Sequence, residues 1–241
     1  MKTTSLKAGL QAKIMSQIKT TNLRFEATQS SGEVSAILMR PENARWLLVL
    51  GHGAGTGMRH SFMEVAAQQL AQNGIATFRY QFPYIEQGKK SPNPLPILMK
   101  TVRSAVAAAS KATGDLPLVV GGKSLGGRMT SSTAAQEPLP GVSGIVFFGF
   151  PLHAPGRPSN DRAAHLYDVH LPMLFLQGTR DKLADLEFLK PVCDKLGTQA
   201  TLHTIEWADH GFHVPKKSGR TDEEVIEELG KTAGEWIAKL G

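Results

Sequence analysis

Short apolar runs alternate with segments of helical periodicity along most of this chain, and this order constrains the fold more than any other feature. The apolar runs are nearly continuous and lie at residues 45–53, 74–82, 116–122, 142–150 and 171–178. Helical spacing of apolar residues occurs between them, at 61–70, 97–111, 125–136 and 183–196. Buried strands that alternate with helices form a parallel sheet covered on both faces. The sequence therefore predicts an α/β fold.

The two edges of the sheet are predicted from weaker patterns. Residues 23–30 and 33–41 alternate apolar and polar side chains around a turn at Ser31-Gly32, which predicts an antiparallel hairpin at one edge. The segment 200–207 supplies the last strand. The sheet is therefore expected to be mostly parallel and to contain about eight strands.

Two helices carry a start signal. Ser61 with Glu64, and Thr221 with Glu224, have the spacing of capping boxes, in which each side chain bonds the backbone of the other residue. The first is expected to begin the helix after the third strand. The second is expected to begin the final helix.

Length and composition favour one domain. The 241 residues suffice for an α/β domain with a sizeable core, and we find no repeat, low-complexity tract or long linker. We assign residues 1–22 to an N-terminal lead-in and residues 23–241 to a single domain. The lead-in carries four lysines and no acid, but it lacks the apolar core and cleavage site of a secretory signal.

Cysteine usage and charge limit the compartment and the partners. Cys193 is the single cysteine, so no disulfide forms within the chain and a cytoplasmic location is expected. No apolar run reaches the ~18 residues of a membrane helix. The net charge of +6 permits anionic partners, but the lysines are scattered and no nucleic-acid-binding motif occurs. We expect a small-molecule substrate, and the oligomeric state stays open.

The stretch "VVGGKSLGGR" (119–128) permits two interpretations. Gly122-Lys123-Ser124 matches the end of a phosphate-binding P-loop, but that loop needs a glycine five residues earlier, where Pro117 stands. The frame G-x-S-x-G instead matches a nucleophile elbow, a sharp turn between a strand and a helix that exposes a serine. Gly122 and Gly126 provide the small residues that this turn requires. We therefore assign Ser124 as the nucleophile.

Three further loops carry the groups that a serine nucleophile needs. An oxyanion hole takes one amide from the residue after the nucleophile, here Leu125, and one from the loop after the third strand. The sequence "GHGAGTG" (51–57) occupies that loop, and we favour the Ala54 amide. Asp181 follows the strand at 171–178, and His210 follows the last strand. The order Ser, Asp, His is the one expected of this architecture.

Rival residues lie close to each assignment. His213 is the alternative base, and it lies three residues further into the loop than His210. Asp185 is the alternative acid, but the helical pattern places it in the next helix. Asp209 adjoins His210 and is expected to point away from it. His52 is expected to bond loop backbone.

These motifs together resemble a known family. Gly122-Lys123-Ser124-Leu125-Gly126-Gly127-Arg128, with "GHGAG", "GTRD" and "ADHGF", resembles the small α/β-hydrolases near dienelactone hydrolase, in particular a branch without a large cap. The resemblance covers about residues 23–240. It implies the α/β-hydrolase fold, no cofactor or metal, and Ser124, Asp181 and His210 as the catalytic triad. Dienelactone hydrolases use a cysteine nucleophile, so their lactone specificity does not carry over. Cys193 is expected in the core.

The loops suggest an open cleft. Residues 151–171 are too few for a large cap and are expected to hold one short helix at 159–167. Tyr84 and Phe212 follow strands and are predicted to contact substrate. Basic side chains gather in the same loops, which favours an anionic substrate: Lys89, Lys90, Arg157, Arg162, Lys216, Lys217 and Arg220.

The triad does not select among acyl substrates. Carboxylesterases, thioesterases, lipases and peptidases use the same three residues, so the sequence predicts a serine hydrolase of ester or thioester bonds that forms an acyl-enzyme. The alternative is a scaffold or interaction protein with the same fold and no catalysis. An intact triad argues against that alternative.

Overall fold

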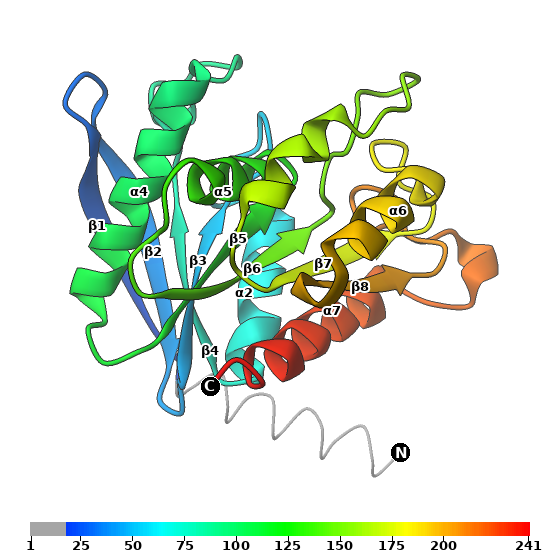
Figure 1. Ribbon diagram of the computed structural model, residues 1–241. Coiled ribbons are helices and arrows are strands. Elements are labelled where there is room, and N and C mark those ends of the chain that lie inside the picture. Colours follow the sequence, from blue (N-terminus) through cyan, green and yellow to red (C-terminus); the bar gives the residue numbers. More distant parts are fainter. Residues whose placement is uncertain (1–17) are drawn as a thin grey trace, which may run out of the picture.

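One eight-stranded sheet runs through the protein (Figure 1). The structure is a computed structural model, and it describes residues 18–241. The strands are β1 (Ile18–Thr28), β2 (Gly32–Pro41), β3 (Trp46–Gly51), β4 (Ile75–Tyr80), β5 (Leu118–Lys123), β6 (Val142–Phe148), β7 (Met173–Gly178) and β8 (Ala200–Ile205). They lie in the order β1-β2-β4-β3-β5-β6-β7-β8. The β1–β2 and β2–β4 pairs are antiparallel and the other five are parallel, which confirms the predicted mostly parallel sheet.

Helices cover both faces of this sheet. They are α2 (Ser61–Gln72), α3 (Pro83–Glu86), α4 (Leu95–Ala112), α5 (Leu125–Gln136), α6 (Leu186–Leu196) and α7 (Asp222–Ile237), with 3₁₀ helices η1 (Asp161–Asp168), η2 (Gly197–Gln199) and η3 (Lys216–Ser218). The apolar residues of α2 and α7 share a core layer with Leu48 and Val119 of the central strands. Those of α4, α5 and α6 pack against the opposite face, around Val120 and Phe147. The predicted α/β architecture is therefore confirmed.

The strands of the central sheet supply a continuous buried layer. Every residue of β3, β4, β5 and β7 is buried. This explains why their sequences are continuous apolar runs rather than alternating ones. The carboxyl ends of the parallel strands lie at one edge of the sheet, so the loops after β3, β5, β7 and β8 can meet there.

Strand β1 begins earlier than predicted. The predicted lead-in ended at residue 22, but residues 18–22 pair in register with residues 37–41 of β2. Lys19, Thr20, Thr21 and Asn22 lack the alternation of apolar side chains that indicates a strand. Backbone pairing to β2 at the edge of the sheet extends the strand through them. The rest of the predicted lead-in, residues 1–17, lies outside the described residues.

Of the two predicted capping boxes, one is present in the structure and the other is not. Helix α7 has its box, with Thr221 and Glu224 each bonded to the backbone of the other. Helix α2 begins at Ser61 as predicted, but its N-cap is His60, whose Nδ1 accepts from the Phe62 amide at 3.3 Å. Ser61 is already helical, which places its hydroxyl one residue too late to cap the helix.

The segment between β6 and β7 is short and contains η1, close to the helix predicted at 159–167. Within this segment, His165 Nε2 lies 2.8 Å from the Ser131 hydroxyl of α5, which joins η1 to the domain. Among residues 18–241, none of the helices combines the length and apolar character that a membrane crossing requires.

Candidate active site

Ser124 stands at a strained turn between β5 and α5. Its φ of 50° and ψ of −111° lie in a region that side-chain-bearing residues rarely adopt. The turn brings backbones too close for larger neighbours. A Cβ on Gly122 would lie 2.4 Å from Gly127 N, and one on Gly126 would lie 2.2 Å from Gly51 O. The two glycines of the G-x-S-x-G frame are therefore required by close backbone contact, as the sequence predicted.

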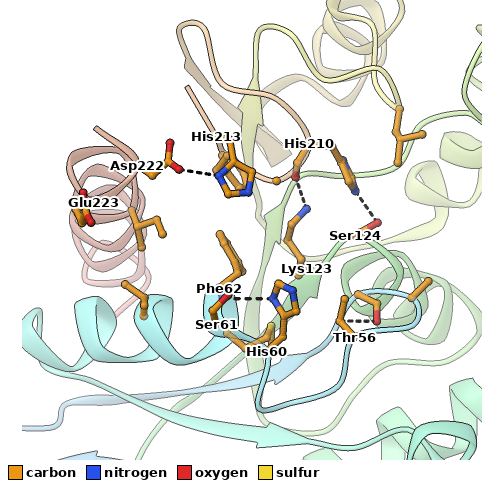
Figure 2. Close-up of a pocket in the computed structure, with 18 residues that line it drawn as sticks. Thr56, His60, Ser61, Phe62, Lys123, Ser124, His210, His213, Asp222 and Glu223 are labelled. Atoms are coloured by element: carbon orange, nitrogen blue, oxygen red, sulfur yellow. Dashed lines mark hydrogen bonds and ion pairs between the residues drawn. The ribbon is translucent and has the colours of Figure 1, made fainter. Parts of the chain in front are cut away.

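The three side chains predicted as a triad form one hydrogen-bonded row. His210 Nε2 lies 2.9 Å from Ser124 Oγ, and His210 Nδ1 lies 2.7 Å from Asp181 Oδ2. Figure 2 shows the His210 ring pointing at the Ser124 hydroxyl. The residues come from three loops, after β5, β7 and β8, which the parallel sheet gathers at one edge.

The Asp181 carboxylate is held from behind by a residue that the sequence analysis missed. Gln177, on β7, donates from Nε2 to Asp181 Oδ2 at 2.5 Å, and the Leu183 amide donates to Oδ1 at 2.8 Å. Gln177 Oε1 accepts from the Phe150 amide at 3.0 Å, so the amide group of Gln177 is oriented with its donor toward Asp181. Gln177 is fully buried within an otherwise apolar strand. A single polar residue in an apolar strand was the available signal.

The loop after β3 lines the same cavity as Ser124. His52 is buried, with Nδ1 2.7 Å from Gly53 O, and its Nε2 accepts from the Phe82 amide at 3.1 Å. Burial lowers the pKa of His52 to about 4, so the ring is neutral. His52 therefore bonds loop backbone, as predicted. Within residues 18–241, neither the Ala54 amide nor the Leu125 amide has a protein acceptor, so both are free to bind another group.

A family comparison agrees with this geometry. The model of a family described as "Alpha/beta hydrolase domain" matches residues 44–238. The chain belongs to this family.

Solved structures of other hydrolases share the fold. A dienelactone hydrolase from Anabaena variabilis superposes with a TM-score of 0.73 at 20% identity, covering 92% of this chain and 98% of its own. A serine hydrolase homologue from Coxiella burnetii has a TM-score of 0.71 at 16% identity, with coverages of 88% and 96%. A serine hydrolase without lid from Xanthomonas campestris has a TM-score of 0.69 at 18% identity, with coverages of 90% and 95%. The predicted α/β-hydrolase fold is confirmed.

The rival residues of this alpha/beta hydrolase have other partners. His213 Nδ1 lies 2.7 Å from Asp222 Oδ2, and the hydrogen bond to Asp222 raises the pKa of His213. Asp185 is the N-cap of α6 and accepts from the Glu187 amide. The Asp209 carboxylate accepts from the amides of residues 211 and 213, which folds the loop around His210. These contacts leave Asp181 and His210 as the pair that is hydrogen-bonded in a row with Ser124.

A cavity of about 600 Å³ opens beside Ser124. It lies between the first turns of α2 and α7 and the loop after β8 (Figure 2). Its apolar lining includes Phe62, Met63, Val65, Phe212 and Ile226. The cavity runs from Ser124 to Asp222 and Glu223 at the start of α7.

The two aromatic residues predicted to contact substrate have different places. Phe212 lines the cavity and stacks on Phe62, with ring centroids 5.6 Å apart. Tyr84 is fully buried and does not line the cavity. Its hydroxyl accepts from the Gly55 amide at 3.1 Å. Because α3 directs the Tyr84 ring into the core, Tyr84 hydrogen-bonds from the interior to the loop that carries Ala54.

The predicted basic rim does not reach the cavity. None of its seven lysines and arginines is among the lining residues. Arg162 donates to His153 O, Arg220 binds Glu228, and Lys217 lies over the Trp207 ring. These three side chains bind local partners instead. The rim therefore does not contact the cavity directly, and an anionic substrate stays a prediction.

Other reactive groups lie apart from the site. Cys193 is buried on α6, where burial raises the pKa of its thiol to about 11, in agreement with the predicted core position. Within residues 18–241, no group of three or more His, Cys, Asp or Glu side chains is arranged to hold a metal ion.

Proposed function

We propose that this alpha/beta hydrolase cleaves carboxylic ester or thioester bonds of a small substrate through an acyl-enzyme on Ser124. The observation that carries the proposal is the hydrogen-bonded row from Ser124 through His210 to Asp181. A serine hydroxyl beside a histidine that is oriented by a buried carboxylate is the arrangement that activates a nucleophile.

The proton path follows from the row. Asp181 accepts from His210 Nδ1, which leaves the lone pair of Nε2 facing the Ser124 hydroxyl. His210 takes the hydroxyl proton as Ser124 Oγ attacks the substrate carbonyl carbon. The imidazolium then gives this proton to the departing alkoxide or thiolate. Water attacks the acyl-enzyme with His210 again as base, which releases the acid and restores Ser124.

Negative charge develops on the substrate carbonyl oxygen during the attack, and hydrogen-bond donors must stabilise it. The amides of Ala54 and Leu125 have no protein acceptor in the described chain; Leu125 follows Ser124 directly, and Ala54 lines the same cavity as Ser124. Leu125 is also the first residue of α5, and the N-terminus of a helix favours negative charge. We assign these two amides as the oxyanion hole.

The cavity indicates the kind of acyl group. Its lining includes the apolar side chains of Phe62, Met63 and Ile226, which favour an apolar chain over a charged one. Its size suits a short or medium acyl chain. We retain both ester and thioester leaving groups, because the attacked carbonyl is the same.

A fluorophosphonate probe tests this function directly, since it phosphonylates only an activated serine. The wild type should label, and Ser124→Ala should not label while keeping its circular dichroism spectrum. Ser131→Ala is the matched control, because Ser131 also contacts a histidine but lies away from the cavity. A panel of p-nitrophenyl esters and acyl thioesters then measures turnover. A wild type that neither labels nor turns over any of these would favour a non-catalytic scaffold.

A further inference from the structure

Lys123, the residue before Ser124, is a buried lysine whose ammonium group contacts a backbone carbonyl and lies near two aromatic rings. It is 9% exposed, and its Nζ donates to the His210 carbonyl oxygen at 2.5 Å. Figure 2 shows this bond beside the His210–Ser124 contact. The ammonium group also lies 5.7 Å from the Phe62 ring centroid and 5.4 Å from that of Phe212. Two aromatic rings and one carbonyl oxygen therefore lie around the positive charge, and the residue also lines the cavity.

The Lys123 side chain also lies against two loops, the one after β3 and the one after β6. A Cβ on Gly53 would lie 3.7 Å from Lys123 Cγ, so the lysine stem packs against the loop that carries Ala54. A Cβ on Gly149 would lie 3.1 Å from Lys123 Nζ and 3.5 Å from His210 Cε1. The ammonium group and the imidazole ring thus lie against one glycine, whose missing side chain makes room for both.

We propose that Lys123 is a positioning residue of the proposed triad, whose buried ammonium group fixes the main chain of His210 and holds its ring over Ser124. The proposal rests on the proposed function. The backbone of the loop after β8 includes left-handed residues at Trp207 and Phe212, a conformation that needs outside support. A charged donor supplies a stronger hydrogen bond to the His210 carbonyl than a neutral one. Lys123 contacts the histidine and not the reacting atoms, so its effect should be on turnover.

The burial of Lys123 makes this contact pH-dependent. Burial lowers the pKa of Lys123 to about 8, while the carboxylates of Asp181 and Asp209 oppose that shift. From α2 it faces the Phe62 ring, and from the loop after β6 it faces Gly149. His60 lines the same cavity. Lys123 is therefore an ammonium below pH 8 and increasingly a neutral amine above it, so the hold on His210 should weaken as pH rises through 8.

The test compares wild type, Lys123→Met and Lys182→Met. Methionine keeps the stem of the lysine and removes its donor and charge. Lys182 is an exposed lysine next to Asp181, so its substitution controls for the loss of a charge near the triad. The measurement is kcat and KM for p-nitrophenyl acetate from pH 6 to pH 9.5. We expect kcat to fall about 10- to 100-fold in Lys123→Met, the cost of a misplaced catalytic group, with KM little changed. Lys182→Met should match wild type.

The pH profile separates positioning from a purely structural role. Wild-type kcat should decline with a midpoint near pH 8, and this step should be absent in Lys123→Met. A folded Lys123→Met with wild-type kcat, or one that keeps the step, would overturn the proposal. If Lys123→Met does not fold, the pKa of Lys123 is instead measured in the wild type by NMR titration of its Cε resonance. That pKa must coincide with the midpoint of the decline in wild-type kcat, and a mismatch also overturns the proposal. Failure of the proposed function would look different, because the wild type itself would not label.

Discussion

The Asp181 carboxylate lies 2.7 Å from Nδ1 of His210 and at the same time accepts hydrogen bonds from Gln177 Nε2 and the Leu183 amide. Its side chain is fully buried. Three donors around one buried carboxylate fix its orientation, and through it the tautomer of His210. The proposed acid is therefore held by a hydrogen-bond network that includes Gln177 of β7 and the Leu183 amide in the loop that follows.

Asp181→Asn tests the tautomer. The asparagine amide can donate to Nδ1, which favours the tautomer that turns an N–H toward Ser124, and kcat should fall by roughly 10⁴. Asp185→Asn is the matched control, because Asp185 caps α6 and does not reach His210. Its kcat should equal that of wild type. Loss of activity in Asp185→Asn alone would reverse the assignment of the acid.

Ser124→Gly tests the strain at the nucleophile. With φ at 50° and ψ at −111°, any side chain at this position is strained, and glycine relieves a cost of about 1–3 kcal/mol. Ser124→Gly should therefore be more stable than Ser124→Ala in urea unfolding, although both lack the nucleophile. Within α5, Ser131→Gly should be about 1 kcal/mol less stable than Ser131→Ala, the ordinary order in a helix. If the glycine variant were less stable than the alanine variant at both positions, the turn at Ser124 would carry no strain.

Ile226→Trp tests the place of the acyl chain. Ile226 is a half-buried residue of α7 that lines the cavity, and a larger ring there should obstruct long chains. We expect kcat/KM for p-nitrophenyl octanoate to fall about 10-fold or more, the scale of steric discrimination in apolar pockets, while that for the acetate stays unchanged. Leu95→Trp, at a 49% exposed position of α4, controls for the added ring. An equal loss for both esters would place the acyl chain elsewhere.

His52 should make the fold acid-sensitive. Its pKa is lowered to about 4 in the folded protein by burial, against about 6.5 in the unfolded chain. Between these values the unfolded chain binds the additional proton, so the stability is complete above pH 6.5 and falls as pH decreases toward 4. The loss attributable to His52 is about 3 kcal/mol.

Urea unfolding at pH 7, 5.5 and 4.5 measures this loss. His52→Asn should be less stable than wild type at pH 7, since it disturbs the bonds to Gly53 and Phe82, but it should lose less stability on acidification. His170→Asn, at an exposed position, should run parallel to wild type. Parallel curves for His52→Asn as well would mean that His52 does not remain neutral in the fold.

Patterns local to the sequence determined the elements and the turn at the nucleophile. Continuous apolar runs predicted β3 to β7 because a strand covered on both faces exposes no polar side chain. The spacing of Gly122, Ser124 and Gly126 predicted the elbow because its close contacts arise within one short stretch of chain. Chain order then placed Asp181 and His210 after the correct strands.

Only the tertiary structure decided which distant groups each side chain meets. Gln177 behind Asp181 and the ammonium of Lys123 under His210 depend on how separate strands and loops pack. The Tyr84 hydroxyl binds the Gly55 amide beside Ala54, and the basic rim residues lie outside the cavity lining. The separation of two residues in the sequence does not predict which way their side chains point, because those directions are set by the packing of segments far apart in the chain.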